Sequence, residues 1–333
     1  MAKKDRRGKY LILQDVRVFH DEKTGNIHLT SKDKDLPKHY NFNLTLNSDK
    51  SSELALRKLL FDKGILETMN TFVFLDEHGE GSQDSEGPWD RITLGINKVG
   101  KDVFWYLKSN STMLISGEAG TGKSVVTYGI INHCLKHADR WKLSIVSSNR
   151  TEHSPISNDY PNVEVKTDRT EVLKMVSDIY DEMMERYRIM EDQKVNNFEY
   201  LAVIPSARLL IMDDASSFLS QVGIQTNEGK ENDALTRNIL EFVGHILRLG
   251  RPAGIFSVIS VSSYHLTNEM ISEEMRKNFD VRIHMGRGSE HSSFMTLGKH
   301  KALSIPNSVG RGYVQPDNSR GEEVQFYPSS LRY

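Results

Sequence analysis

A short glycine-rich segment carries the clearest chemical signal in the chain. Residues 117–124 read GEAGTGKS and match the pattern Gly-x-x-x-x-Gly-Lys-Ser. Glycines at this spacing let successive backbone N–H groups approach phosphate oxygens, and a helix beginning near Lys123 adds its positive N-terminal dipole. Lys123 is placed to reach the β- and γ-phosphates of ATP, and the Ser124 hydroxyl to ligate Mg²⁺. A glycine-rich turn with a purely structural role is the alternative. The predicted nucleotide contacts come from nine consecutive residues: Gly117, Glu118, Ala119, Gly120, Thr121, Gly122, Lys123, Ser124 and Val125.

Two adjacent acids end an apolar segment further along the chain. The sequence ARLLIMDD closes with Asp213 and Asp214. Phosphoryl transfer needs a carboxylate that helps to hold Mg²⁺ and a group that orients the attacking water. We predict that Asp213 is the magnesium partner and Asp214 the water-polarising base, on a strand that neighbours the phosphate loop. A helix N-cap and turn are the alternative, since residues 215–219 could begin a helix.

Two arginines follow in the segment HILRLGRPAG. Phosphoryl transfer leaves charge on the γ-phosphate, which a rigidly positioned guanidinium can stabilise. Arg248 and Arg251 lie where a helix ends at Gly250, before Pro252, so they would be presented at a corner of the fold. We predict a catalytic role for both, with a surface salt bridge as the alternative.

Alternating strands and helices must position these residues. Apolar strand segments such as STMLIS, WKLSIVSS, ARLLIMDD and GIFSVISV are separated by segments with helical spacing. Residues 170–193 place six apolar side chains on one helical stripe, and 221–233 read as a polar loop. The predicted fold is α/β: a P-loop NTPase (RecA-like) with a mostly parallel sheet flanked by helices. The stripe residues are Val172, Val176, Ile179, Met183, Tyr187 and Met190.

The chain divides into three parts. Residues 1–75 contain short alternating apolar segments and one helical segment at 53–65, which predicts a small N-terminal α+β module. Residues 76–90 are acidic and rich in glycine and serine, which is typical of a linker. Residues 91–333 are the predicted ATPase domain.

Bulk composition excludes several classes of protein. The chain has 333 residues, 38% of them hydrophobic, and a formal net charge of −2, which argues against a uniformly basic surface that coats nucleic acid. The single cysteine, Cys134, cannot form an internal disulfide. No apolar run approaches the ~18 residues of a membrane span. We therefore expect no membrane insertion, no secretory signal and a cytoplasmic location.

The order of motifs over residues 91–328 resembles the FtsK/SpoIIIE branch of the HerA-FtsK superfamily. After the phosphate loop, similar segments are EMMERYRIMEDQKVNNFEYL, RLLIMDDASSFL, LRLGRPAGIFSVISVS, NFDVRIHM and GRGYVQPD. Glu185, Arg186 and Tyr187 match the core of the family's first helix motif, and Asn197 and Tyr200 its later Asn-x-x-x-Tyr pair. The resemblance implies a ring, usually a hexamer, that drives double-stranded DNA through a central pore. It also makes Arg251 a candidate subunit-bridging arginine, in a short soluble member of the kind expected in a phage or mobile element.

Two departures from the family pattern bear on catalysis. Asp214 stands where the family usually has glutamate, so its carboxylate is one methylene shorter. Residues 261–264 read VSSY where Thr-Gln-Arg-Pro is common, so the hydroxyl of Ser262 could replace the sensor glutamine, with a structural loop serine as the alternative.

Two rival functions therefore stay open. One is a protein-secretion ATPase of the same superfamily, and the other is a weakly hydrolysing, nucleotide-dependent assembly scaffold. Residues 276–278 and 299–301 are basic candidates for a pore, with ordinary solvated surface as the alternative.

Overall fold

A computed structural model gives the fold. It describes residues 87–97, 101–148, 153–219, 227–263, 266–268, 270–300, 302–303, 305, 309–316 and 321–327, and the backbone of five short strands that precede them.

The five N-terminal strands pair antiparallel in the order β4-β3-β2-β1-β5. The alternating segments at 9–20 and 71–75 contribute strands to this sheet as predicted, whereas the helix expected at 53–65 and residues 76–86 of the expected linker lie outside the described residues. The strands are β1 (Gly8–Leu13), β2 (Val16–Asp21), β3 (Asn26–Ser31), β4 (His39–Asn41) and β5 (Val73–Phe74).

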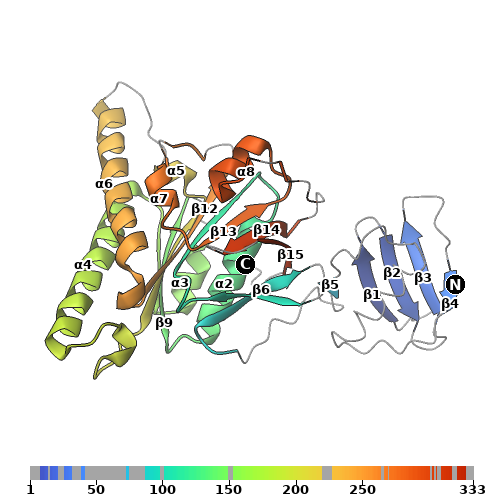
Figure 1. The fold of residues 1–333 in the computed structure, drawn as a ribbon, viewed down its shortest axis with the longest axis horizontal. Coiled ribbons are helices and arrows are strands. Elements are labelled where there is room, and N and C mark those ends of the chain that lie inside the picture. Colours follow the sequence, from blue (N-terminus) through green and yellow to red (C-terminus); the bar gives the residue numbers. More distant parts are fainter. Residues whose placement is uncertain are drawn as a thin grey trace.

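A second, ten-stranded sheet forms the main body of the fold (Figure 1). Its order is β10-β9-β11-β12-β8-β13-β14-β15-β6-β7; the first six strands run parallel and the last four pair antiparallel. The predicted mostly parallel α/β fold is confirmed. The strands are β6 (Arg91–Asn97), β7 (Asp102–Tyr106), β8 (Thr112–Gly117), β9 (Trp141–Ser147), β10 (Val163–Lys166), β11 (Ala207–Asp213), β12 (Ile255–Ser262), β13 (Val281–Met285), β14 (Arg311–Pro316) and β15 (Glu322–Phe326).

Helices cover both faces of the parallel part. Side chains alternate between the two faces of a strand, so Met113 and Ile115 of β8 pack in one core cluster and Leu114 in the other. The first cluster includes the apolar face of α2, and the second packs under α4 and α6, which lie side by side (Figure 1). The helices are α2 (Lys123–Lys136), α3 (Ser154–Asp159), α4 (Arg169–Gln193), η1 (Phe198–Tyr200), α5 (Ser216–Leu219), α6 (Asn227–Leu249), η2 (Arg251–Ala253), α7 (Glu273–Arg276) and α8 (Glu290–Leu297).

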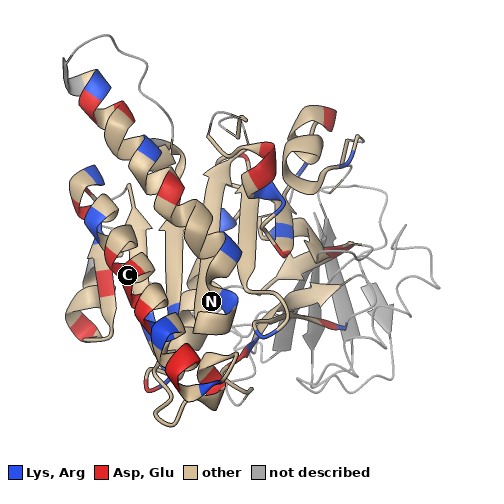
Figure 2. Cartoon of the chain, turned by 60° about the vertical axis from the view of Figure 1, so that its left-hand side comes forward, with Lys and Arg blue, Asp and Glu red and all other residues tan. Residues whose placement is uncertain are grey.

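Helix α4 has the predicted stripe. Asp168 caps its first turn by accepting a hydrogen bond from the amide of Thr170 at 2.9 Å, and Lys194, with φ of 55°, ends it. The predicted stripe residues are buried, except that Tyr187 is half-buried. Charged residues of both signs are interspersed along the helices of the face in Figure 2, as the small net charge leads one to expect.

The loop predicted at 221–233 is wrong over its second half. Helix α6 begins at Asn227, so residues 227–233 are helical, and residues 221–226 lie outside the described residues. Polarity suggested a loop, yet glutamate, lysine and alanine are good helix formers. Exposed Lys230 and Glu231 belong to the solvent side of this helix.

Candidate nucleotide site

The phosphate loop joins a buried strand to a helix, as predicted. Strand β8 is buried along its length and ends at Gly117, and α2 begins at Lys123. Gly122 has φ of 102°, and a Cβ added there would lie 2.6 Å from the amide nitrogen of Gly310. A side chain at this position would be strained by its backbone conformation and blocked by its neighbour. The loop therefore needs glycine at 122 for shape as well as for phosphate approach.

The closing Gly-Arg-Gly turn packs directly against this loop. The amide of Gly310 donates a hydrogen bond to the carbonyl of Thr121 at 2.9 Å, and the amide of Gly286 bonds the carbonyl of Arg311 at 2.8 Å. Two segments nearly 190 positions apart in the sequence are thus held together. The turn at 310–312 supports the phosphate loop from the antiparallel half of the sheet.

Lys123 lies inside the loop. Its Nζ donates hydrogen bonds to the carbonyls of Gly117 and Glu118, each at 3.1 Å. Burial lowers the pKa of Lys123, while the charges of Asp214 and Asp213 oppose this shift. Lys123 and the two acids therefore share one site, and added negative charge there, such as phosphate, would favour the ammonium.

Asp213 is held by three side chains from three different elements. Its Oδ1 accepts hydrogen bonds from Ser260 Oγ at 2.7 Å and Thr127 Oγ1 at 3.4 Å, and its Oδ2 lies 3.2 Å from Nε2 of His153. Burial alone would raise the pKa of Asp213, but the bonds from His153 and Ser260 and the charge of Lys123 outweigh it and lower the pKa. These partners come from β12, α2 and the segment before α3. The carboxylate of Asp213 is therefore held at the edge of the sheet, and none of these bonds involves an amide of α5.

The donor set fits a magnesium ion. Thr127 lies three residues after Ser124 on α2 and bonds Asp213, so Ser124 lies on the side of the helix that meets the carboxylate. A hydroxyl and an ionised carboxylate are the hard oxygen ligands that Mg²⁺ takes beside water and phosphate oxygens. Ser124 and Asp213 are the residues that would hold it.

The strand order corrects one expectation. Strand β11, which carries Asp213, does not neighbour β8, because β12 lies between them. The predicted direct adjacency is therefore wrong. Strand β12 links the two, since Ser260 bonds Asp213 on one side and Ser262 pairs with Gly117 on the other. Ser262 thus pairs with the first residue of the phosphate loop.

Asp214 occupies a strained turn. Its φ is 48°, its side chain is exposed, and its amide donates a hydrogen bond to Ser260 Oγ at 2.9 Å. Non-glycine residues rarely adopt this left-handed conformation, and it often marks functional positions. Asp214 lies near enough to Lys123 for its charge to oppose the lowering of the pKa of that lysine.

Sequence reasoning missed three residues of this site: Thr127, His153 and Ser260. Ser260 left a signal, because serines at 257, 260 and 262 are polar positions in a strand that is otherwise apolar and buried. His153 gave no comparable signal. It is fully buried, yet it follows a polar segment, and only tertiary structure brings its ring to Asp213.

Arg248 and Arg251 lie at the opposite edge of the sheet from the phosphate loop. Both are exposed and directly precede β12, whose eight residues span roughly 25 Å before the loop edge is reached. Arg251 Nη1 donates to the carbonyl of Ser109 at 3.3 Å, and Arg248 Nη2 lies 2.9 Å from Nδ1 of His245. Neither guanidinium can reach the phosphate loop of its own chain.

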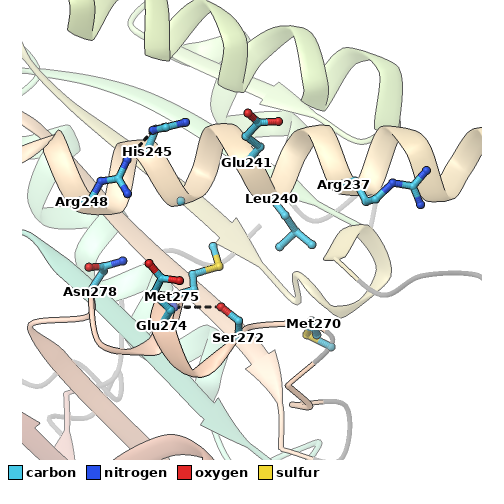
Figure 3. A pocket seen from close by; sticks show the side chains of 11 residues that line it. Arg237, Leu240, Glu241, His245, Arg248, Met270, Ser272, Glu274, Met275 and Asn278 are labelled. Carbon is cyan, nitrogen blue, oxygen red and sulfur yellow. Dashed lines mark hydrogen bonds between the residues drawn. The ribbon is translucent and has the colours of Figure 1, made fainter.

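Arg248 also lines a pocket between α6 and α7 (Figure 3). Arg237, Glu241 and Glu274 share this pocket with it, and the floor includes Leu240 and Met275. The lining therefore carries charges of both signs.

The basic candidates at 276–278 are accounted for by local structure. Arg276 is buried and donates to the carbonyl of Ile271 and to Oδ1 of Asn268, each at 2.7 Å. Lys277 pairs with Glu273 at 2.9 Å. At the second candidate, Lys299 donates to the hydroxyl of Tyr313 at 2.9 Å. These contacts favour the alternative of ordinary structural surface.

Comparisons with known proteins place this geometry in a family. Residues 82–286 match the model of the FtsK/SpoIIIE family. The DNA translocase FtsK of Campylobacter jejuni subsp. jejuni serotype O:2 is 23% identical over 233 residues, covering 66% of this chain and 23% of the relative. The Helicobacter pylori 26695 protein of the same name is 25% identical over 259 residues, covering 74% and 28%. The chain thus spans about a quarter of the length of these relatives.

Solved structures share the fold. The pCW3 conjugation coupling protein TcpA, in its monomer form, aligns with a TM-score of 0.65 at 19% identity, covering 75% of this chain and 70% of that one. The cytoplasmic domain of the Thermomonospora curvata type VII secretion ATPase EccC aligns at 0.57 and 17% identity, covering 76% and 31%.

No helix among the described residues is long and apolar enough to cross a bilayer. The phosphate loop after a buried strand, the acid pair at the end of β11 and the family match over more than half of the chain agree with one another. The chain belongs to the FtsK/SpoIIIE family and is a P-loop ATPase.

Proposed function

We propose that this chain is a subunit of a ring, hexameric as in the family it resembles, that couples ATP hydrolysis to the movement of double-stranded DNA. The family match and the relatives named DNA translocases support the substrate. The division into an N-terminal module (1–75), a linker (76–90) and the ATPase domain (91–333) belongs to the same proposal.

The observation that carries the ring is the position of Arg251. The predicted catalytic arginine lies one strand length away from the loop that holds Lys123, on an exposed corner of the opposite edge. A guanidinium there can stabilise γ-phosphate charge only if a second copy of the chain places its phosphate loop against this corner. Arg248, on the same edge, would assist by charge.

Within one subunit, the loop amides and Lys123 bind the triphosphate and neutralise its charge. Ser124 and Asp213 would hold a magnesium ion, which would supply positive charge beside the phosphates. Asp214 accepts a hydrogen bond from the attacking water and orients it toward the γ-phosphorus. As the water oxygen bonds to the γ-phosphorus, the bond between that phosphorus and the bridging oxygen of the β-phosphate breaks, one water proton passes to Asp214 and on to solvent, and ADP and phosphate leave.

One observation favours a slower enzyme as the second candidate. Asp214 is a methylene shorter than glutamate and sits in a left-handed turn, so its reach toward water is limited. A nucleotide-dependent assembly scaffold with little turnover would have these features. The similarity to EccC shows a shared fold, and it does not favour protein as the cargo.

ATP turnover with and without long duplex DNA tests the proposal. A motor hydrolyses ATP faster with DNA, and Lys123→Ala removes this activity. Binding of ATP without hydrolysis would support the scaffold, and hydrolysis that ignores DNA would count against DNA as the cargo.

A further inference from the structure

The backbone around Arg251 accepts hydrogen bonds from side chains of α4. We define the arginine corner as residues 249–254, which join α6 to β12. Two hydrogen bonds bracket Arg251: the hydroxyl of Tyr187 donates to the carbonyl of Leu249 at 2.8 Å, and Nη1 of Arg186 donates to the carbonyl of Ala253 at 2.7 Å. Each of these carbonyls lies two residues from Arg251, one on either side.

Arg186 does this from a buried position. Arg186 as a whole is 6% exposed, and its guanidinium also donates through Nη2 to the carbonyl of Ser206 and to Oε1 of Glu182. A planar fork with several bonds has one orientation, so the carbonyl of Ala253 is fixed relative to α4. A carbonyl left without this donor would be buried and unsatisfied, at a cost in free energy.

A third contact comes from η1. Gly254 has φ of 71°, and a Cβ added there would lie 2.7 Å from ring carbons of Phe198. The chain returns from α4 to η1 through a tight connection, in which the amide of Val195 bonds the carbonyl of Met190 at 2.9 Å. The ring of Phe198 therefore packs directly against Gly254, at the end of the corner.

The backbone of the arginine corner is held firmly, whereas the side chain of Arg251 is not. The backbone of the corner is held by buried donors, whereas Arg251 is exposed, and among the described residues its guanidinium donates one hydrogen bond, at 3.3 Å to the carbonyl of Ser109. A firmly held backbone with an exposed guanidinium suits a group that must meet a phosphate outside its own chain with little loss of side-chain freedom.

We infer that Arg186 and Tyr187 are positioning residues for Arg251, which set where its guanidinium stands against the phosphate loop of a second copy of this chain. This inference rests on the proposed role of Arg251 between subunits. It gives the Glu-Arg-Tyr segment of α4 a role in catalysis at a distance from any phosphate.

Mixed oligomers of the full chain test the inference, because the corner and the phosphate loop act in different subunits. A Lys123→Ala subunit keeps its corner but cannot hydrolyse ATP, and an Arg251→Ala subunit keeps its loop but lacks the arginine. Oligomers that contain both, purified through two tags, should recover ATP turnover. Tyr187→Phe is then added to one kind of subunit at a time.

Tyr187→Phe in the Lys123→Ala subunit should lower the recovered turnover by about three- to tenfold, the scale of one hydrogen bond. The same change in the Arg251→Ala subunit should leave the recovered turnover unchanged, because that corner no longer carries an arginine. A structural role would weaken both combinations alike. Arg186→Lys provides a second variant with the same expected asymmetry, and Tyr180→Phe, on the same helix beside Phe242, is the matched control.

The outcomes distinguish the role of Arg251 between subunits from the positioning role of Tyr187. If the Lys123→Ala and Arg251→Ala subunits assemble but recover no turnover, the proposed role of Arg251 between subunits is wrong. If they recover turnover and Tyr187→Phe acts equally in either subunit, or in neither, the positioning role of Tyr187 is overturned while that of Arg251 stands.

Discussion

The hydroxyl of Ser260 lies 2.7 Å from Oδ1 of Asp213 and donates a hydrogen bond to it, while the amide of Asp214 donates to the same hydroxyl at 2.9 Å. One serine on β12 therefore bonds both acids at the end of β11: the carboxylate of Asp213 and the backbone of Asp214. Its place on the strand between β11 and β8 makes it the link between the acids and the phosphate loop.

Ser260→Ala should weaken the hold on Asp213 without abolishing nucleotide binding. The variant leaves a buried carboxylate with one donor fewer, so we expect a loss of about 2 kcal/mol in the free energy of unfolding. The magnesium concentration needed for half-maximal nucleotide binding should rise about tenfold, as with other groups that orient metal ligands. Titration with magnesium and a fluorescent ATP analogue measures this.

Ser257→Ala is the matched control on the same strand. The Ser257 hydroxyl is buried and has no hydrogen-bond partner among the described residues, so its removal should leave stability unchanged or raised. Equal effects of the two substitutions would show that Ser260 has no special relation to Asp213.

Lys123→Ala should abolish catalysis while preserving the fold. Among the described contacts, Lys123 donates only to carbonyls of its own loop. Its loss therefore leaves the hydrogen bond from Ser260 to the buried carboxylate of Asp213 in place. We expect turnover to fall by about 10²- to 10³-fold, the scale of one preorganised electrostatic contact. Lys136→Ala, exposed at the end of the same helix, is the control. An unchanged rate in Lys123→Ala would remove the loop from the mechanism.

Asp214→Asn should separate binding from hydrolysis. Asparagine tolerates the left-handed φ of 48° at this position, so the turn should persist while the base is lost. We expect ATP binding within about twofold of the parent and turnover lower by about 10²-fold or more, as for loss of a general base. Asp214→Glu, which keeps a carboxylate, should retain turnover. If Asp214→Asn hydrolyses ATP at the parental rate, another group orients the water.

The phosphate loop could be predicted from sequence because its chemistry is local. Eight consecutive residues define the loop, and the buried strand before it and the helix after it have their own periodicity. The same holds for Asp213 and Asp214, which end an apolar strand, and for the stripe of α4. In each case the residues that carry the signal lie within a few turns of one another.

What escaped prediction depends on pairing at long range. Nothing in the sequence of β12 states that it lies between β8 and β11, because strand order is set by how the crossovers pack. His153 and Thr127 reach Asp213 only after the sheet has formed. The contacts of Arg186 also escaped prediction: the sequence matched it to a family motif, whereas its burial and its carbonyl partners on two other segments appear only in the folded chain.

Acid should weaken the fold through Glu182, which lies between two buried arginines. Its carboxylate accepts hydrogen bonds from Nη2 of Arg186 at 2.5 Å and Nη1 of Arg208 at 2.6 Å. Burial raises the pKa of Glu182, but the two guanidinium groups outweigh this and hold the pKa below its usual value. The unfolded chain, with a pKa near ~4.3, then binds the proton more readily than the folded one.

The sign of the pH dependence follows from that order. The stabilisation is fully present above the unfolded pKa and is lost as the pH falls through the lower, folded value. Glu182→Gln should therefore be less stable than the parent at pH 7, and the gap should close from about pH 5 downward. Urea unfolding at pH 7, 5, 4 and 3 measures the gap, with Glu191→Gln, exposed on the same helix, as control. A gap that stays constant across this range would mean that the ionised carboxylate of Glu182 adds nothing beyond the packing of its side chain.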